Sequence, residues 1–192
     1  FPYLDGSVKN LGIIKSSITS TSSDNNSYVG TIAYASTSST IENCYYSGKI
    51  SASGAVNTYV GALIGYSDGT VSHCYSIGNI TAKTTNYVYA GGLVGYSSGS
   101  IFNSYTTCDV SSESSQLRAY AGGFVGYANS GKITKCFAAG DVSAKGSNET
   151  YSRNGGFSGF CANEDIVVDC YKSNSQILTR YTTNGSEYCT VG

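Results

Sequence analysis

Seven cysteines, one histidine and one short acidic cluster are the residues of this 192-residue chain whose types could do chemistry. A zinc site of the usual kind needs Cys or His ligands in closely spaced pairs, and the chain has no such pair. His73 has no Ser or Cys nucleophile pattern around it, so we expect it to be structural. We therefore predict no catalytic residue, no metal site and no cofactor.

The acidic cluster comprises Glu164, Asp165 and Asp169. Carboxylates cleave glycosidic bonds in many enzymes, and they also bind calcium. Catalysis on a sheet surface would also need basic residues, and no group of Lys or Arg accompanies the cluster. We interpret it as a solvated turn, with weak calcium binding and catalysis as the two alternatives.

The composition excludes several classes of protein. There are 11 Lys and Arg against 12 Asp and Glu, and no basic patch suits nucleic acid or an anionic membrane surface. No apolar run is long enough for a membrane span, so we predict no membrane insertion. With 24 Gly, 18 Tyr, 32 Ser, 18 Thr and one Pro, the chain favours strands and tight turns over helices.

The same sequence pattern recurs about every 31 residues along the chain, and such a period indicates a repeat protein. One position of the repeat is occupied by tyrosine in the first four copies, at Tyr28, Tyr59, Tyr89 and Tyr120. The fifth copy has Arg153 at this position, and the sixth has Tyr188. Each repeat has a glycine-rich run, a piece that begins with a β-branched residue, and a short alternating piece, followed by a polar connection of variable length.

Three apolar pieces separated by turns predict three short strands per repeat and about six stacked coils. The expected fold is an all-β parallel β-helix. We expect it to be right-handed, because crossover connections between parallel strands of one sheet are right-handed. Residues 1–192 form one domain that begins and ends in the middle of a coil, so we expect a fragment of a longer protein.

Successive coils of such a solenoid lie about 4.8 Å apart, so equivalent residues should stack in columns. We expect a bend at Asn43, His73 and Asn103, because Asn tolerates the left-handed conformation. Two apolar columns should form the core. They are Leu63, Leu93, Phe124 and Phe157, and Ile41, Val71, Ile101, Ile133 and Val167.

Four cysteines fall in one column, namely Cys44, Cys74, Cys136 and Cys170. The favoured interpretation is small buried free thiols. A bridge, with Cys44–Cys74 the best candidate, and a metal site are the alternatives. The coil separation permits a disulfide by Cα distance, but in-register side chains point the same way. The other cysteines, which lie in other columns, are Cys108, Cys161 and Cys189.

Two aromatic columns are also expected. One contains Tyr45, Tyr75, Tyr105, Phe137 and Tyr171, and the other contains Tyr66, Tyr96 and Tyr127. Stacked rings that fix the register are the favoured interpretation. The alternative is an exposed ladder that binds carbohydrate or protein.

The run Gly92-Leu93-Val94-Gly95, followed by Tyr96, a Ser-Gly turn, Ile101, Asn103 and Tyr105, resembles the GLUG repeat. Residues 62–65, 123–126 and 156–159 match it with one or two substitutions, and the resemblance covers nearly the whole chain. It implies a large secreted or surface-anchored bacterial protein, either adhesin-like or an immunoglobulin A1 metallopeptidase. The metal motif of those peptidases, His-Glu-x-x-His, is absent from this chain.

We therefore expect a non-catalytic structural or adhesive repeat module, located outside the cell and secreted or anchored to its surface. The expected partners are a host protein or glycan and flanking domains of the same polypeptide, with no nucleic acid. The alternatives are a carbohydrate-binding or carbohydrate-active β-helix and a non-catalytic region of a secreted peptidase.

Overall fold

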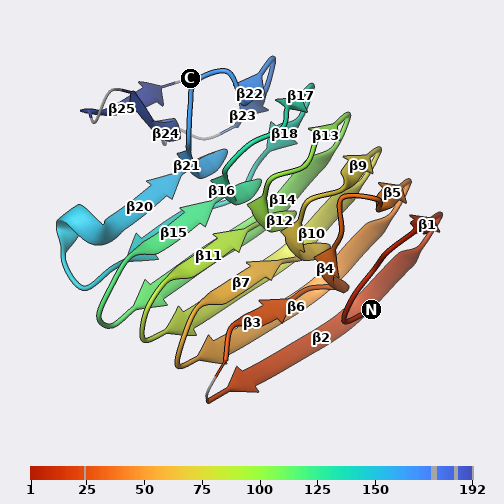
Figure 1. Cartoon of the computed structure of the whole chain (residues 1–192), viewed down its shortest axis with the longest axis horizontal. Coiled ribbons are helices and arrows are strands. Elements are labelled where there is room, and N and C mark those ends of the chain that lie inside the picture. Colours follow the sequence, from red (N-terminus) through yellow and green to blue (C-terminus); the bar gives the residue numbers. More distant parts are fainter. Residues whose placement is uncertain (24, 174–176, 184–185, 192) are drawn as a thin grey trace.

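A computed structural model describes residues 1–23, 25–173, 177–183 and 186–191. The chain winds as a β-solenoid of roughly five turns, and equivalent strands of successive turns lie side by side (Figure 1). Within the described residues the single helix is the 3₁₀ turn η1 (Glu149–Tyr151), and none of them forms a helix that could span a bilayer. The prediction of an all-β fold built of stacked coils is confirmed.

Each turn passes through four sheets, which we number in chain order. Sheet 1 contains β1 (Ser7–Lys9), β5 (Thr40–Glu42), β9 (Thr70–Ser72), β13 (Ile101–Phe102), β17 (Ile133–Thr134) and β22 (Val167–Val168). Sheet 2 contains β2 (Gly12–Ser22), β6 (Tyr45–Gly54), β10 (Tyr75–Thr84), β14 (Tyr105–Ser114), β18 (Phe137–Ala138), β19 (Val142–Lys145) and β23 (Tyr171–Lys172).

The other two sheets are formed by shorter strands. Sheet 3 contains β3 (Ser27–Val29), β7 (Thr58–Gly61), β11 (Val88–Gly91), β15 (Ala119–Gly122) and β20 (Ser152–Gly155). Sheet 4 contains β4 (Ile32–Ala35), β8 (Ile64–Ser67), β12 (Val94–Ser97), β16 (Val125–Ala128), β21 (Ser158–Cys161), β24 (Ile177–Thr183) and β25 (Ser186–Val191).

Four strands per coil correct the sequence prediction of three. The glycine-rich run is divided between sheets 3 and 4, because the chain turns at residues such as Ala62 and Leu63. A Cβ on Gly61 would collide with the carbonyl oxygen of Ile64, so the turn requires glycine there. The predicted third piece is the second half of the long strand in sheet 2.

The predicted bend joins sheet 1 to sheet 2 in every coil. Asn43, His73 and Asn103 have φ angles of 54°, 53° and 51°, which is the left-handed region. The equivalent residues of the other coils share this conformation and are Asn10, Lys135 and Asp169. The bend allows the apolar residue before it and the Cys or Ser after it both to face the interior.

The register of the columns is confirmed over most of the chain. Val8 pairs with Ile41, and Tyr120 pairs with Arg153, as aligned from the sequence. Tyr188 is the exception. Its strand β25 pairs antiparallel with β24 and does not continue sheet 3, so Tyr188 does not occupy the tyrosine position of a sixth copy of the repeat.

The interior is filled by the two predicted columns. Leu63, Leu93, Phe124 and Phe157 have no exposed surface, and the rings of Phe124 and Phe157 stack at 4.8 Å. Each such side chain stabilises the fold by about 1.5–3 kcal/mol through burial. A second apolar cluster between sheets 2 and 3 includes Ile80 and Val110. The interior is therefore filled by apolar side chains, and a binding site can form only on the outer faces of the sheets.

Candidate functional site

The outer face of sheet 2 is the broadest regular surface of the solenoid. Along β14 exposed and buried residues alternate, so every second side chain of the strand points outward. Because β6, β10 and β14 pair in register over ten residues, these outward side chains form straight rows across the coils. The rows run along the solenoid axis, perpendicular to the strands.

The first row is aromatic; Tyr45 and Tyr75 are partly exposed, and the rest of the row, from Tyr105 onward, is exposed. The rings of Tyr45, Tyr75 and Tyr105 stack with centroids 4.9 and 5.0 Å apart and planes within 2° of parallel. Phe137 and Tyr171 continue the row in register, and their exposed fractions are 36% and 68%. Since stacked rings cover one another's faces, the row offers mainly ring edges and phenol hydroxyls to solvent.

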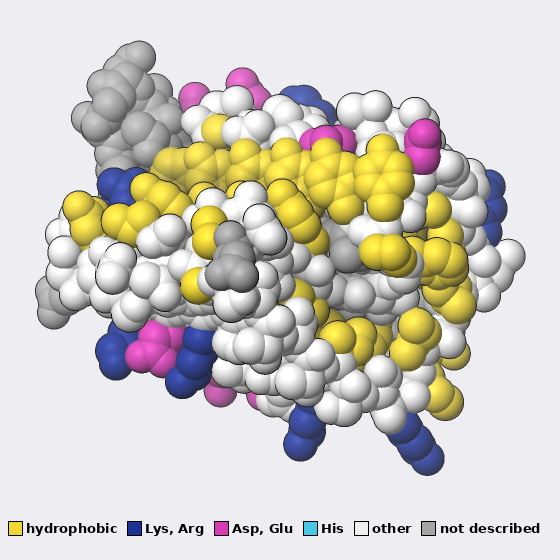
Figure 2. Space-filling view, turned by 60° about the horizontal axis from the view of Figure 1, so that its bottom comes forward, with side chains coloured by type: hydrophobic (Ala, Val, Ile, Leu, Met, Phe, Trp, Pro, Cys, Tyr) yellow, Lys and Arg dark blue, Asp and Glu magenta, His cyan; other side chains and the backbone are white. Residues whose placement is uncertain are grey.

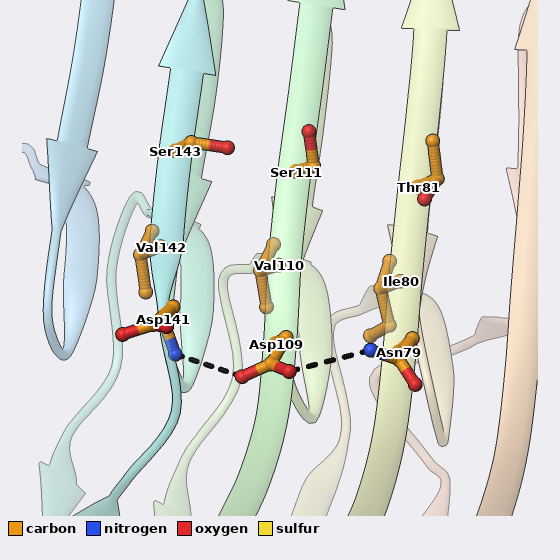
Figure 3. A pocket seen from close by; sticks show the side chains of 9 residues that line it. All are labelled: Asn79, Ile80, Thr81, Asp109, Val110, Ser111, Asp141, Val142 and Ser143. Atoms are coloured by element: carbon orange, nitrogen blue, oxygen red, sulfur yellow. Dashed lines mark hydrogen bonds between the residues drawn. The ribbon is translucent and has the colours of Figure 1, made fainter.

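Four residues farther along the strands, a shallow groove crosses three coils (Figure 3). Asn79, Asp109 and Asp141 form one side of the groove, which has a volume of about 230 Å³. Asp109 ties the row together, because it accepts hydrogen bonds from the Asn79 side chain at 3.3 Å and from the Asp141 backbone N–H at 2.9 Å. The other outward side is a row of hydroxyls, namely Thr81, Ser111 and Ser143.

Several polar groups of the groove have no hydrogen bond within the described part of the chain. They are the Asp141 carboxylate and the hydroxyls of Thr81, Ser111 and Ser143. Backbone atoms of the sheet are already paired, so these side chains are the groups that water or a ligand can bind.

Beyond the groove lies a row of alternating charges. The Glu113 carboxylate contacts Lys83 at 3.0 Å and Lys145 at 3.2 Å, and the hydrogen bonds from these two lysines lower the pKa of Glu113. All three side chains are well exposed, so the pairs add little stability. Together with Lys49, Asp109 and Asp141, three positive and three negative charges balance over the coils from β6 to β19, and Lys15 of β2 adds one positive charge outside this part of the face.

Two further aromatic ladders cover the corner between sheets 3 and 4. Tyr59 and Tyr89 stack at 4.9 Å, Tyr66 and Tyr96 at 4.8 Å, and Tyr59 meets Tyr66 edge to face at 5.8 Å. In Figure 2 hydrophobic side chains form a continuous row along the molecule, as expected of ladders that carry one ring per coil. Burial raises the pKa of Tyr59 to about 12. These rings are half-buried and support the structural interpretation of the second predicted column.

The cysteines do not form a reactive cluster. All six whose side chains are described are free thiols, and all but Cys170 are buried. The Cys44 N–H donates to the Cys74 sulfur at 3.4 Å, and burial raises the pKa of Cys74 to about 12. The prediction of buried free thiols is confirmed for five of the seven cysteines. Cys170 is only partly buried, and the side chain of Cys189 lies outside the part of the chain whose side chains the structure describes.

His73 and the acidic cluster remain separate from one another and from the groove. The exposed His73 ring lies 3.4 Å from the Asn103 amide and edge-on to Phe102 at 6.2 Å. Glu164, Asp165 and Asp169 are exposed, as a solvated turn should be. No group of three His, Cys, Asp or Glu residues among those described is placed to hold a metal ion.

Sequence reasoning missed the groove. Its signal was present, because Lys49, Asn79, Asp109 and Asp141 each follow the column of Gly48, Gly78, Cys108 and Gly140. A further signal was missed in the tyrosines, where a spacing of seven residues links Tyr59 to Tyr66 and Tyr89 to Tyr96. Both patterns can be interpreted only when it is known which side chains of each strand point outward.

A family model described as the GLUG motif matches residues 56–81 and 118–143. No curated protein and no solved structure matches the chain. The two matched segments are equivalent parts of two different coils, and each runs from the start of sheet 3 through sheets 4 and 1 into sheet 2. The chain therefore contains a GLUG-motif repeat region, and it is a repeat module with a β-solenoid fold.

Proposed function

We propose that this GLUG-motif solenoid is a non-catalytic binding module that presents the outer face of sheet 2 as a rigid adhesive surface. The observation that carries the proposal is an in-register row of partly or fully exposed rings on the same face as a groove of polar side chains. Large aromatic side chains left exposed in a row are unusual unless they serve recognition, because burying them would stabilise the fold.

Rigidity supports the same role. The face is built on paired strands whose side chains stack every coil, so little conformational entropy is lost when a partner binds. The module would act outside the cell, as the stalk or adhesive part of a secreted or surface-anchored protein, with a host protein or glycan as partner. This location rests on the resemblance of its repeats to those of such proteins.

The test is binding of the labelled chain to an array that carries both glycans and extracellular host proteins. We expect at least one ligand to be retained, and to be lost in a variant of this face in which Tyr105, Tyr171 and Asp141 are replaced by Ser. A matched control replaces the exposed Lys132, Asn129 and Asp165 by Ser and should bind normally. Equal binding by both variants contradicts the proposal, and release of shortened glycan products would favour a carbohydrate-active enzyme instead.

A further inference from the structure

We infer that the groove of sheet 2 binds an extended, uncharged β-linked glycan that lies along the solenoid axis with one sugar unit over each coil. The inference rests on the binding role proposed above and names the ligand of that surface. It is carried by three properties of the face, which are its period, its charge and its hydrogen-bonding groups.

The period is set by the coils. Rings of the exposed row repeat every 4.9–5.0 Å, and the groove residues Asn79 and Asp109 occupy successive positions of the same register. A polymer that follows the axis meets an equivalent set of side chains once per coil. Sugar units of an extended β-1,4-linked glycan are about as long as one coil is tall, whereas α-1,4-linked glucans coil into helices and do not keep this register.

The charge of the face favours an uncharged ligand. Asp109 and Asp141 lie in the groove itself, so an acidic polymer would be repelled there. The neighbouring Lys83 and Lys145 are occupied by Glu113 and do not offer a basic site. Lys49 continues the row beyond Asn79, but the three lysines of these coils are balanced by three carboxylates, so a nucleic acid or an acidic polysaccharide would meet no net positive field.

The groups in the groove suit sugar hydroxyls. Carboxylate and amide side chains accept and donate hydrogen bonds on one side, and a row of hydroxyls does both on the other. Asp109 is held by Asn79 and by the Asp141 backbone, so its carboxylate is already oriented before a ligand arrives. The two rows are two residues apart, roughly 7 Å, so a single flat chain that lies over the groove can reach both rows.

The aromatic row completes the surface on the side of Tyr105 and Phe137. Its ring edges lie roughly 13 Å from the acidic row along the strands. Between them lies a row of small or apolar side chains that includes Thr107 and Ala139. A second glycan chain, such as the neighbouring chain of a fibre, would lie over this row. The affinity for a glycan fibre should therefore exceed the affinity for a single chain.

The experiment measures the affinity of the intact chain for cellohexaose, chitohexaose, maltohexaose and hexagalacturonate by calorimetry, and its adsorption to cellulose and chitin. We expect binding of the two β-linked oligomers only. Asp141→Ala and Asp109→Ala should weaken it at least about tenfold, since each removes a charge-assisted hydrogen bond. Asp165→Ala, an exposed acid on another part of the solenoid, is the matched control and should change nothing.

Equal binding of maltohexaose would overturn the register, and a preference for hexagalacturonate would overturn the charge reasoning. If the chain binds an arrayed protein but none of these glycans, the adhesive function stands and the glycan inference is wrong. If it binds nothing on the array or in calorimetry, both are wrong. Circular dichroism of each variant separates a lost contact from a lost fold.

Discussion

At the scale of single residues, the conformation of the bends is set by side chains that tolerate it unequally. The left-handed region costs a residue with a Cβ roughly 1–2 kcal/mol, and Asn bears this better than most because its short side chain bonds locally. Asn occupies the bend in three coils, and His73, Lys135 and Asp169 occupy it in the other three. Asp and His also tolerate this region, so the local strain falls on Lys135, whose φ is 54°, and the packing around it offsets that strain.

Replacement of Lys135 tests this. Lys135→Gly should raise the free energy of unfolding by about 0.5–1 kcal/mol, because glycine adopts the left-handed region without steric cost but loses more entropy on folding. Lys135→Val should lower it by about 1–2 kcal/mol, since a β-branched residue suits that region worst. Urea unfolding measures both. A stabilising effect of valine would contradict the assignment of strain to this position.

Cys170 is the one described cysteine that is only partly buried, and a hydrogen bond from the Cys136 thiol lowers its pKa. The thiolate is the reactive form, so Cys170 should react first among the six described cysteines. Brief treatment of the native protein with iodoacetamide, followed by peptide mass spectrometry, checks this. Modification of the buried Cys74 at a similar rate would show that the column is more open than the structure indicates.

At the scale of elements, the aromatic ladders of sheets 3 and 4 act as continuous supports. Each stacked or edge-to-face pair contributes about 0.5–1.5 kcal/mol beyond its buried area, and each tyrosine takes part in several. Burial also raises the pKa of Tyr34 to about 12, with a further contribution from its hydrogen bond to Asp68 at 2.9 Å. The ladders therefore stabilise the fold only while their hydroxyls are protonated.

The solenoid should lose stability in alkali for this reason. The folded state holds the protons of Tyr34 and Tyr59 more tightly than the unfolded chain, whose tyrosines ionise near pH 10. Their contribution is complete below about pH 10 and is lost as the pH rises towards about 12. Urea unfolding at a series of pH values measures the loss. Tyr59→Phe, which keeps the ring but cannot ionise, should show a shallower decline, and an unchanged slope would be evidence against this role.

At the scale of the whole molecule, stability comes from contacts between neighbouring coils. Each coil bonds through its backbone to the one above and the one below, so a defect in a central coil affects both sides. Leu93 lies in such a coil, is fully buried, and packs in the column that also contains Leu63 and Phe124.

Leu93→Asp should therefore unfold the domain, because it places an unpaired charge in the central column. Leu93→Ala should leave it folded but less stable by about 2–5 kcal/mol. Ile77→Asp, on the outer face where the side chain is 43% exposed, is the control and should have little effect. Thermal melts distinguish the three, and a normal melt for Leu93→Asp would show the column to be wrongly placed.

Much of this fold was predictable because its columns can be aligned from the sequence alone. The core column of Leu93 and the bend at Asn103 follow from residue type and spacing. The number of strands did not follow, because the turn at Ala62 and Leu63 lies inside an apolar run and shows no polar residue. Gly61, which the turn requires, lies among other glycines and apolar residues, so it does not by itself show where one strand ends and the next begins.

The groove was not predicted for a different reason. Asn79, Asp109 and Asp141 are brought together by the register of three strands and by the direction their side chains take. The register could be aligned from the sequence, but the alignment alone did not show that the residue after the Gly78 column faces outward in each coil, as the alternation along β10 and β14 requires. Functional rows on a sheet surface depend on such details more than the core does.

The uniform pairing of the coils also bears on how a gene for this protein changes in length. Val60 pairs with Ala90 and Gly61 with Gly91, so loss of residues 61–90 would join Val60 to Gly91 without disturbing any register. Unequal recombination between repeats of the gene can thus remove or add one complete coil in a single event. The product keeps its register, and its outer surface is shorter by the side chains of one coil, here those of Tyr75, Asn79 and Lys83.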